Sequence, residues 1–175
     1  NRPIITLNHY FKIIIRLVVE LKKPNINLLA VIVAVPVIGM TIIAPALTII
    51  KNDLNISFEN TQLILTLYFT FLAFGQILSG PFSDKYGRKP ILLLGASIYS
   101  ISAFFASLSS NIEILLILRC FQGFGAAACL SVGRTLLSDC YEIKEAAKEM
   151  SKMTAIMAVI PISCFIFGGF LAEFL

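Results

Sequence analysis

The fold of this chain is decided at residues 80–89, where the sequence is GPFSDKYGRK between two long apolar segments. This stretch combines two glycines, one acid and three bases, a composition that is hard to explain between the apolar segments of a soluble core. At a membrane surface, the bases would hold the stretch in the cytoplasm, and the glycines would allow two helices to reverse direction tightly. We therefore predict a short cytoplasmic loop between two membrane-spanning helices.

Composition supports a membrane protein. The chain has 175 residues, of which 58% are hydrophobic and only 14% are charged, whereas about a quarter of the residues in soluble domains are charged. A domain of this size has no core large enough to bury so much apolar surface, so lipid must solvate part of it. The net charge of +4 does not indicate nucleic-acid binding, because the bases are not clustered on an aromatic-rich polar face.

Neither a metal site nor a cofactor site is predicted. The only histidine is His9, and no two cysteines form a C-x-x-C pair. Cysteines in apolar segments are typical small buried residues rather than members of a disulfide or zinc framework. The cysteines are Cys120, Cys129, Cys140 and Cys164.

Apolar segments of about the 20 residues that a bilayer requires predict five membrane-spanning helices. They cover about residues 28–50, 61–80, 91–110, 113–136 and 151–172. Before them, charges recur every four residues at Lys12, Arg16 and Glu20 among apolar residues, which predicts an amphipathic helix over about residues 6–22 in the headgroup region. We therefore expect an all-α membrane protein, with a cytoplasmic amphipathic helix in residues 1–24 and a helical bundle in residues 25–175.

The distribution of bases predicts the orientation of the bundle. If the N-terminus is cytoplasmic, 12 of the 14 bases lie on the cytoplasmic side, while Lys51 lies outside and Arg119 lies within a span. Such an excess is typical of cytoplasmic segments. The 12 bases are Arg2, Lys12, Arg16, Lys22, Lys23, Lys85, Arg88, Lys89, Arg134, Lys144, Lys148 and Lys152.

The pattern Gly-x-x-x-Asp-Lys-x-Gly-Arg-Lys resembles the signature loop between the second and third spans of the major facilitator superfamily of transporters. Members have about twelve spans in two halves of six, so the chain resembles most of an N-terminal half and stops after the fifth span. The resemblance implies a conformational latch, in which we expect Arg88 to pair with Asp139 and Asp84 to lack a partner, because in the family this acid faces the second half. The expected latch residues are Gly80, Asp84, Gly87, Arg88, Lys89 and Asp139.

Arg119 lies inside the fourth predicted span, in the sequence RCFQGFGAA at residues 119–127. A base at membrane depth costs about 2.5–3.5 kcal/mol on insertion scales and usually faces a cavity or a partner; snorkelling to the outer surface is the alternative. The stretch resembles the fourth-span motif of drug:proton antiporters, in which the arginine lines the cavity and takes part in proton coupling. Gln122, one helical turn away, would face the same side.

The fifth and first spans complete the resemblance and limit it. Pro161, Gly168 and Gly169 are similar to the antiporter motif of the fifth span, which implies a gate helix that Pro161 is expected to kink. In the first span, Thr41 stands where the family has an acidic residue, and the interiors of spans one to four contain no Asp or Glu. Either the proton-coupling carboxylate belongs to the second half, or coupling is lost.

Over about residues 28–173 the chain resembles the N-terminal half of a bicyclomycin/chloramphenicol-resistance (Bcr/CflA) type multidrug exporter. The resemblance implies alternating access in the bacterial inner membrane, with small amphipathic drugs exported in exchange for protons and with a C-terminal half as partner. The alternative is a truncated, non-transporting remnant of such a transporter. An enzyme is not expected, because the sequence lacks Gly-x-Ser-x-Gly, His-Glu-x-x-His and paired membrane carboxylates.

Overall fold

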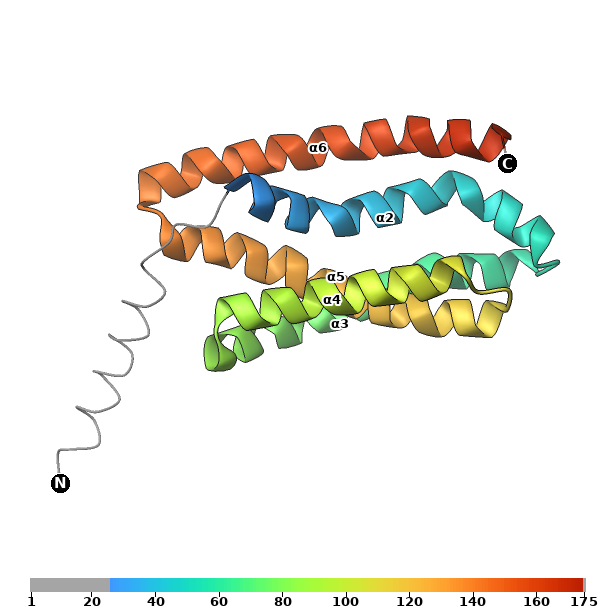
Figure 1. The fold of residues 1–175 in the computed structure, drawn as a ribbon, viewed down its shortest axis with the longest axis horizontal. Helices are drawn as coiled ribbons and strands as arrows, with labels where there is room; N and C mark the ends of the chain where they lie inside the picture. Colours follow the sequence, from blue (N-terminus) through green and yellow to red (C-terminus); the bar gives the residue numbers. More distant parts are fainter. Residues whose placement is uncertain (1–25, 175) are drawn as a thin grey trace, which may run out of the picture.

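A computed structural model describes residues 26–174 of the chain, which form five α-helices and no strand. The prediction of an all-α membrane bundle is confirmed, while the amphipathic helix expected over residues 6–22 lies outside the described residues. The helices are α2 (Ile26–Asp53), α3 (Phe58–Tyr86), α4 (Arg88–Ser107), α5 (Ile112–Cys140) and α6 (Ile143–Phe174) (Figure 1).

The number of spans depends on how α2 is counted. Helices α3 to α6 are each long and apolar enough to cross a membrane. Helix α2 adds a fifth span if its parts at residues 27–41 and 43–53, which meet at 43°, are taken together. Pro36 and Pro45 lie inside α2, and a proline removes a backbone donor and bends a helix. The bend is therefore located in α2. Pro161 lies inside α6, which is one continuous helix, and the kink expected at Pro161 stays a prediction.

The predicted loop at residues 80–89 is wrong. Helix α3 continues through Gly80 and Asp84 to Tyr86, and α4 begins at Arg88, so only Gly87 lies between them. Gly87 has a φ of 96°, a conformation that glycine adopts at low cost. A polar sequence marks where a helix leaves the lipid, but the helix continues because its backbone hydrogen bonds are satisfied equally well in water.

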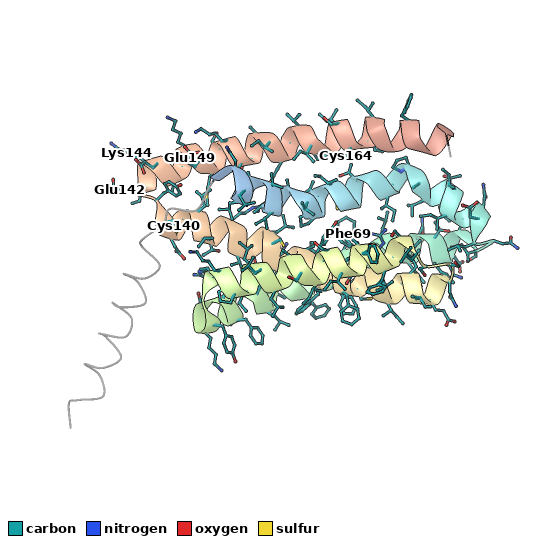
Figure 2. The ribbon with its side chains drawn as sticks, viewed as in Figure 1. Phe69, Cys140, Glu142, Lys144, Glu149 and Cys164 are labelled. Atoms are coloured by element: carbon teal, nitrogen blue, oxygen red, sulfur yellow. The ribbon has the colours of Figure 1, made fainter. Side chains whose placement is uncertain are left out.

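The same reasoning applies to the start of α6. The fifth span was expected to begin at about residue 151, but α6 begins at Ile143 and includes the charged residues before the span. Figure 2 shows Glu142, Lys144 and Glu149 together where α5 ends and α6 begins. We call this the charged end of the bundle. Helix α3 also meets α4 at this end (Figure 1).

Helix α5 is the centre of the bundle: α3 and α4 both pack against it, and α2 packs against both α5 and α6 (Figure 1). Glycines bring the helix backbones close together. A Cβ added at Gly123 would lie 2.3 Å from the backbone oxygen of Tyr68, and one added at Gly125 would lie 2.6 Å from the backbone oxygen of Gly95. Small residues are the usual means of close helix packing in membranes.

Buried and exposed apolar residues have distinct locations. One buried cluster joins α2, α4, α5 and α6 through Leu29, Val33, Leu92, Val132, Leu136 and Met153. Large apolar side chains are exposed on the outside of the helices, including Phe74, Ile77, Phe104, Phe121 and Ile166. A soluble protein rarely exposes so many, so these faces are suited to lipid or to further protein.

Replacing Gly125 by alanine is expected to destabilise the bundle. The added Cβ would overlap backbone atoms of α4, and overpacking of this kind costs about 1–3 kcal/mol. Thermal unfolding of the purified chain in detergent should shift to a lower temperature. Gly80→Ala is the matched control, because nothing lies within 4 Å of its added Cβ. Equal stability of Gly125→Ala and Gly80→Ala would contradict the close approach of α4 and α5.

Candidate functional site

The first candidate site is the Arg88 cluster at the charged end, made of Ser83, Asp84, Arg88 and Asp139. Arg88 is the first residue of α4, and its side chain reaches both neighbouring helices. Its Nη1 lies 2.8 Å from Asp84 Oδ1 of α3, and its Nε donates to Asp139 Oδ2 of α5 at 2.9 Å. Nη1 also donates to the Ser83 hydroxyl. One guanidinium therefore connects α3, α4 and α5.

Only some of the predicted latch residues contact one another in the structure. Arg88 and Asp139 form the ion pair expected from the sequence, but Asp84 is not without a partner, because Arg88 reaches it across the junction of α3 and α4. Gly80 has open space beside it, and Lys89 is exposed. Ser83 was not identified from the sequence. Its position directly before Asp84, near the end of α3, was a usable indication that it lies beside Arg88.

The Arg88 cluster is only partly shielded from water. The exposed fractions of the side chains are 24% for Arg88, 66% for Asp84 and 50% for Asp139. Ion pairs exposed to this extent contribute little, about 0.2–1 kcal/mol. The contact is therefore weak enough to break and re-form, which a latch requires, but its role as a latch stays a prediction.

The second candidate site is the Arg119 cluster, made of Tyr68, Tyr99, Arg119 and Gln122. Arg119 is only 8% exposed and Gln122 only 4%. Arg119 Nη1 donates to Gln122 Oε1 at 2.8 Å, so both side chains lie on the same face of α5, as predicted. This burial favours an inward-facing arginine over a snorkelling one.

Two members of the Arg119 cluster, Tyr68 and Tyr99, were not identified from the sequence. The Tyr68 hydroxyl of α3 donates to the Pro36 oxygen of α2 at 3.1 Å, and the Tyr99 hydroxyl of α4 donates to the Val35 oxygen at 3.3 Å. Both lie within electrostatic range of Arg119. A usable signal was present, because a tyrosine inside a span needs a partner for its hydroxyl.

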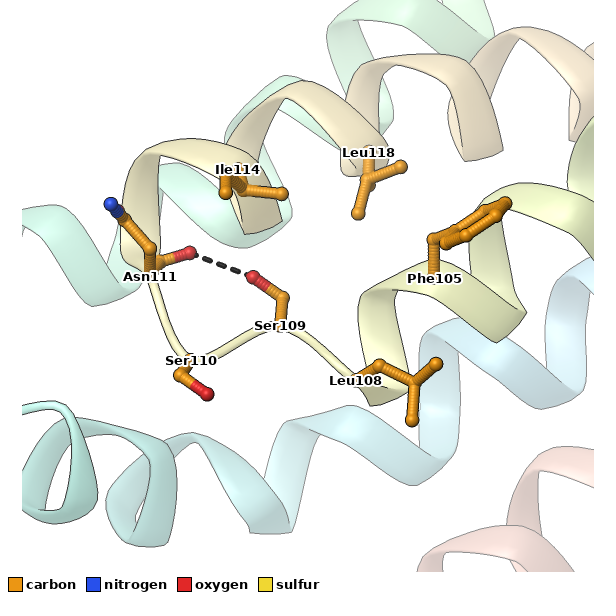
Figure 3. Close-up of a pocket in the computed structure, with 7 residues that line it drawn as sticks. All are labelled: Phe105, Leu108, Ser109, Ser110, Asn111, Ile114 and Leu118. Atoms are coloured by element: carbon orange, nitrogen blue, oxygen red, sulfur yellow. Dashed lines mark hydrogen bonds between the residues drawn. The ribbon is translucent and has the colours of Figure 1, made fainter.

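The remaining predicted residues are not members of the Arg119 cluster. The Thr41 hydroxyl donates to the Val37 oxygen at 2.6 Å within α2. Pro161 lies inside α6, and Gly168 and Gly169 lie near its C-terminal end. A pocket where α4 ends and α5 begins contains none of the predicted residues (Figure 3). Within residues 26–174, no group of three or more His, Cys, Asp or Glu side chains could hold a metal ion.

A base buried inside a membrane span usually faces a partner, a cavity or a substrate or ion pathway. The sequence matches the Major Facilitator Superfamily over residues 29–175, and the chain therefore belongs to that superfamily of transporters and is not an enzyme. This confirms the family predicted from the sequence motifs.

Three of the similar relatives carry drug-resistance names. The chain is 33% identical to a bicyclomycin resistance protein homolog of Haemophilus influenzae, over 83% of this chain and 37% of the relative. It is 29% identical to multidrug resistance protein D of Escherichia coli, over 86% and 39%. It is 34% identical to a chloramphenicol resistance protein of Pseudomonas aeruginosa, over 71% and 30%. The chain thus spans about a third of the length of these relatives.

The Arg88–Asp139 contact can be measured by a double-mutant cycle. Arg88→Gln, Asp139→Asn and the double variant should reveal a coupling energy of about 0.2–1 kcal/mol in thermal or denaturant unfolding, because the pair is partly exposed. Salt should reduce this coupling. Arg134→Gln is the control, since Arg134 is exposed and lies on the same helix as Asp139. Additive effects of Arg88→Gln and Asp139→Asn at low salt would argue against the pairing.

Proposed function

We propose that this chain is the N-terminal part of an exporter of small amphipathic drugs that works by proton antiport and alternating access. The observation that carries the proposal is the buried Arg119–Gln122 pair on the central helix of a superfamily bundle. A base inside a span is a strong indication of a substrate or ion pathway. The drug-resistance names of the relatives support the kind of molecule exported.

In this proposal the two clusters have separate tasks. Arg119 and Gln122 line the central cavity between the two halves of the transporter. The Arg88 cluster holds α3, α4 and α5 together at the cytoplasmic end in one state and releases them in the other, with Gly80, Gly87 and Lys89 in the same latch segment. Helix α6, with Pro161, Gly168 and Gly169, is the gate helix.

Proton antiport requires a carboxylate whose protonation changes within the membrane. The acidic residues of the described helices lie within about two turns of a helix end, and none lies beside Arg119. The proposal therefore assigns the coupling carboxylate to the second half of the transporter, the partner with which this chain would assemble. The substrate and the protons would pass between the two halves.

We further propose that the protein lies in a bacterial inner membrane with its N-terminus in the cytoplasm. The proposal rests on the base asymmetry, which places the charged end of the bundle on the cytoplasmic side. It can be tested by labelling single cysteines in a variant that lacks the four native ones. Lys85 and Asn52 are suitable positions because both are exposed, whereas Ser83 is buried and Asn55 has a φ of 48°.

In intact cells an impermeant thiol reagent that reaches the periplasm should label Asn52→Cys. It should label Lys85→Cys only after the inner membrane is permeabilised. The two variants serve as controls for each other, since they lie on opposite sides of the membrane in this topology. Labelling of Lys85→Cys in intact cells would reverse the proposed orientation.

Export can be measured in a strain that lacks its own multidrug exporters. The chain is expressed with the second half of a related exporter, and accumulation of a fluorescent amphipathic dye is followed. We expect lower accumulation than in cells with either half alone, and a loss of this difference in Arg119→Ala, because the cavity loses its base. Arg134→Gln should retain export, since Arg134 lies outside both clusters.

Equal accumulation in all these strains, with both halves present in the membrane, would overturn the proposed export. Collapse of the proton gradient by an uncoupler provides a second measurement. Export that continues after this collapse would contradict proton antiport while leaving drug export in place.

A further inference from the structure

One edge of the buried Arg119 guanidinium has no protein partner within residues 26–174. Gln122 accepts a hydrogen bond from Nη1. Nε is buried and has no hydrogen-bond partner, and the described residues also offer none to Nη2. The unoccupied side is the Nε–Nη2 edge, whose two parallel N–H groups match the two oxygens of a carboxylate.

The charge of Arg119 is also without a counterion in the described part of the chain. Its hydrogen-bond partner Gln122 is neutral, and no described carboxylate forms an ion pair with it. The groups within electrostatic range are the phenols of Tyr68 and Tyr99. A buried charge is retained only when it is paired or reached by a ligand, so an anionic group is the partner that Arg119 would accept.

The tyrosine hydroxyls are not free to donate to an anion at Arg119. Their hydroxyl hydrogens are committed to the Pro36 and Val35 oxygens of α2. The Tyr99 hydroxyl also packs closely against Gly39 of α2. A Cβ added at Gly39 would overlap the Tyr99 hydroxyl oxygen. Around the phenols the packing is apolar, with Val35, Met40, Leu72 and Ala126. An unpaired guanidinium edge beside an apolar surface fits a molecule that carries one anionic group on an apolar body.

We propose that the Nε–Nη2 edge of Arg119 binds a carboxylate carried by the transported molecule. The substrate class is then amphipathic carboxylic acids, including zwitterions, rather than molecules whose only charge is positive. This inference rests on the proposed export function and specifies its substrate. It also assigns Gln122 a positioning role, since Gln122 holds Nη1 and thereby turns the opposite edge toward the ligand.

Binding can be tested with three naphthalene probes of the same size and different charge: 2-naphthoate, 2-naphthalenemethanol and 2-naphthylmethylammonium. The chain contains no tryptophan, so naphthalene fluorescence anisotropy is read with little interference from the protein. With the purified chain in lipid nanodiscs, we expect 2-naphthoate to bind at least about tenfold more tightly than the other two probes, since each good charge-assisted contact has about this effect.

Variants separate the bidentate contact from charge alone. Arg119→Gln should bind 2-naphthoate no better than the neutral probe, and Arg119→Lys should bind it about tenfold more weakly than the native chain, because lysine lacks the planar fork. Arg134→Gln is the matched control and should bind as the native chain does. Circular dichroism and elution volume verify folding, and the Arg119→Lys variant keeps the test decisive if Arg119→Gln does not fold.

Three results would overturn the inference. They are equal binding of 2-naphthoate and 2-naphthalenemethanol, native affinity in Arg119→Lys, or loss of 2-naphthoate binding when the second half of a related exporter is co-purified. The last result would assign the edge to a carboxylate of that half. Export of a cationic dye without 2-naphthoate binding would leave the proposed function standing and remove only this substrate class.

Discussion

The structure depends on the close approach of α5 to α3 and α4. At Gly125 the α5 backbone comes so near to Gly95 and Tyr99 of α4 that a single methyl group would overlap them, and at Gly123 the same is true of the α3 backbone at Tyr68. Lipid provides no hydrophobic drive for helices to associate, so packing at this distance has to hold the bundle together. The two tyrosines lie at these contact points, and their side chains are therefore carried to α2 and to Arg119.

A consequence of this packing is that the polar groups inside the bundle are arranged around α2. The Tyr68 and Tyr99 hydroxyls donate to neighbouring carbonyls of α2, ahead of its bend at residues 41–43. These bonds come from two different helices, and both lie where water is scarce, so they are stronger there than at a surface. Helix α2 is in this way attached to α3 and α4 by directional bonds and to α6 by apolar packing.

The features that the sequence predicted are those that depend on local composition. The apolar segments predicted the helices. The spacing of three residues between Arg119 and Gln122 predicted that they share one face of α5. The ends of helices were predicted poorly, since residues 80–86 are polar but helical, and the charged segment at residues 143–150 is continuous with the helix of the fifth span. Charge marks contact with water and not the end of a helix. The Tyr68 and Tyr99 hydrogen bonds and the bend in α2 depend on which helices become neighbours, and the sequence alone does not specify this.

The junction at Gly87 has a mechanical consequence. A connection of one residue has no slack, and its φ of 96° is a conformation that few other residues tolerate. Helices α3 and α4 cannot slide past each other along their axes, because a shift of even one helical turn would need about 5.4 Å of spare chain. The end of α3 and the start of α4 must therefore move together, and Arg88 transmits their displacement to the end of α5.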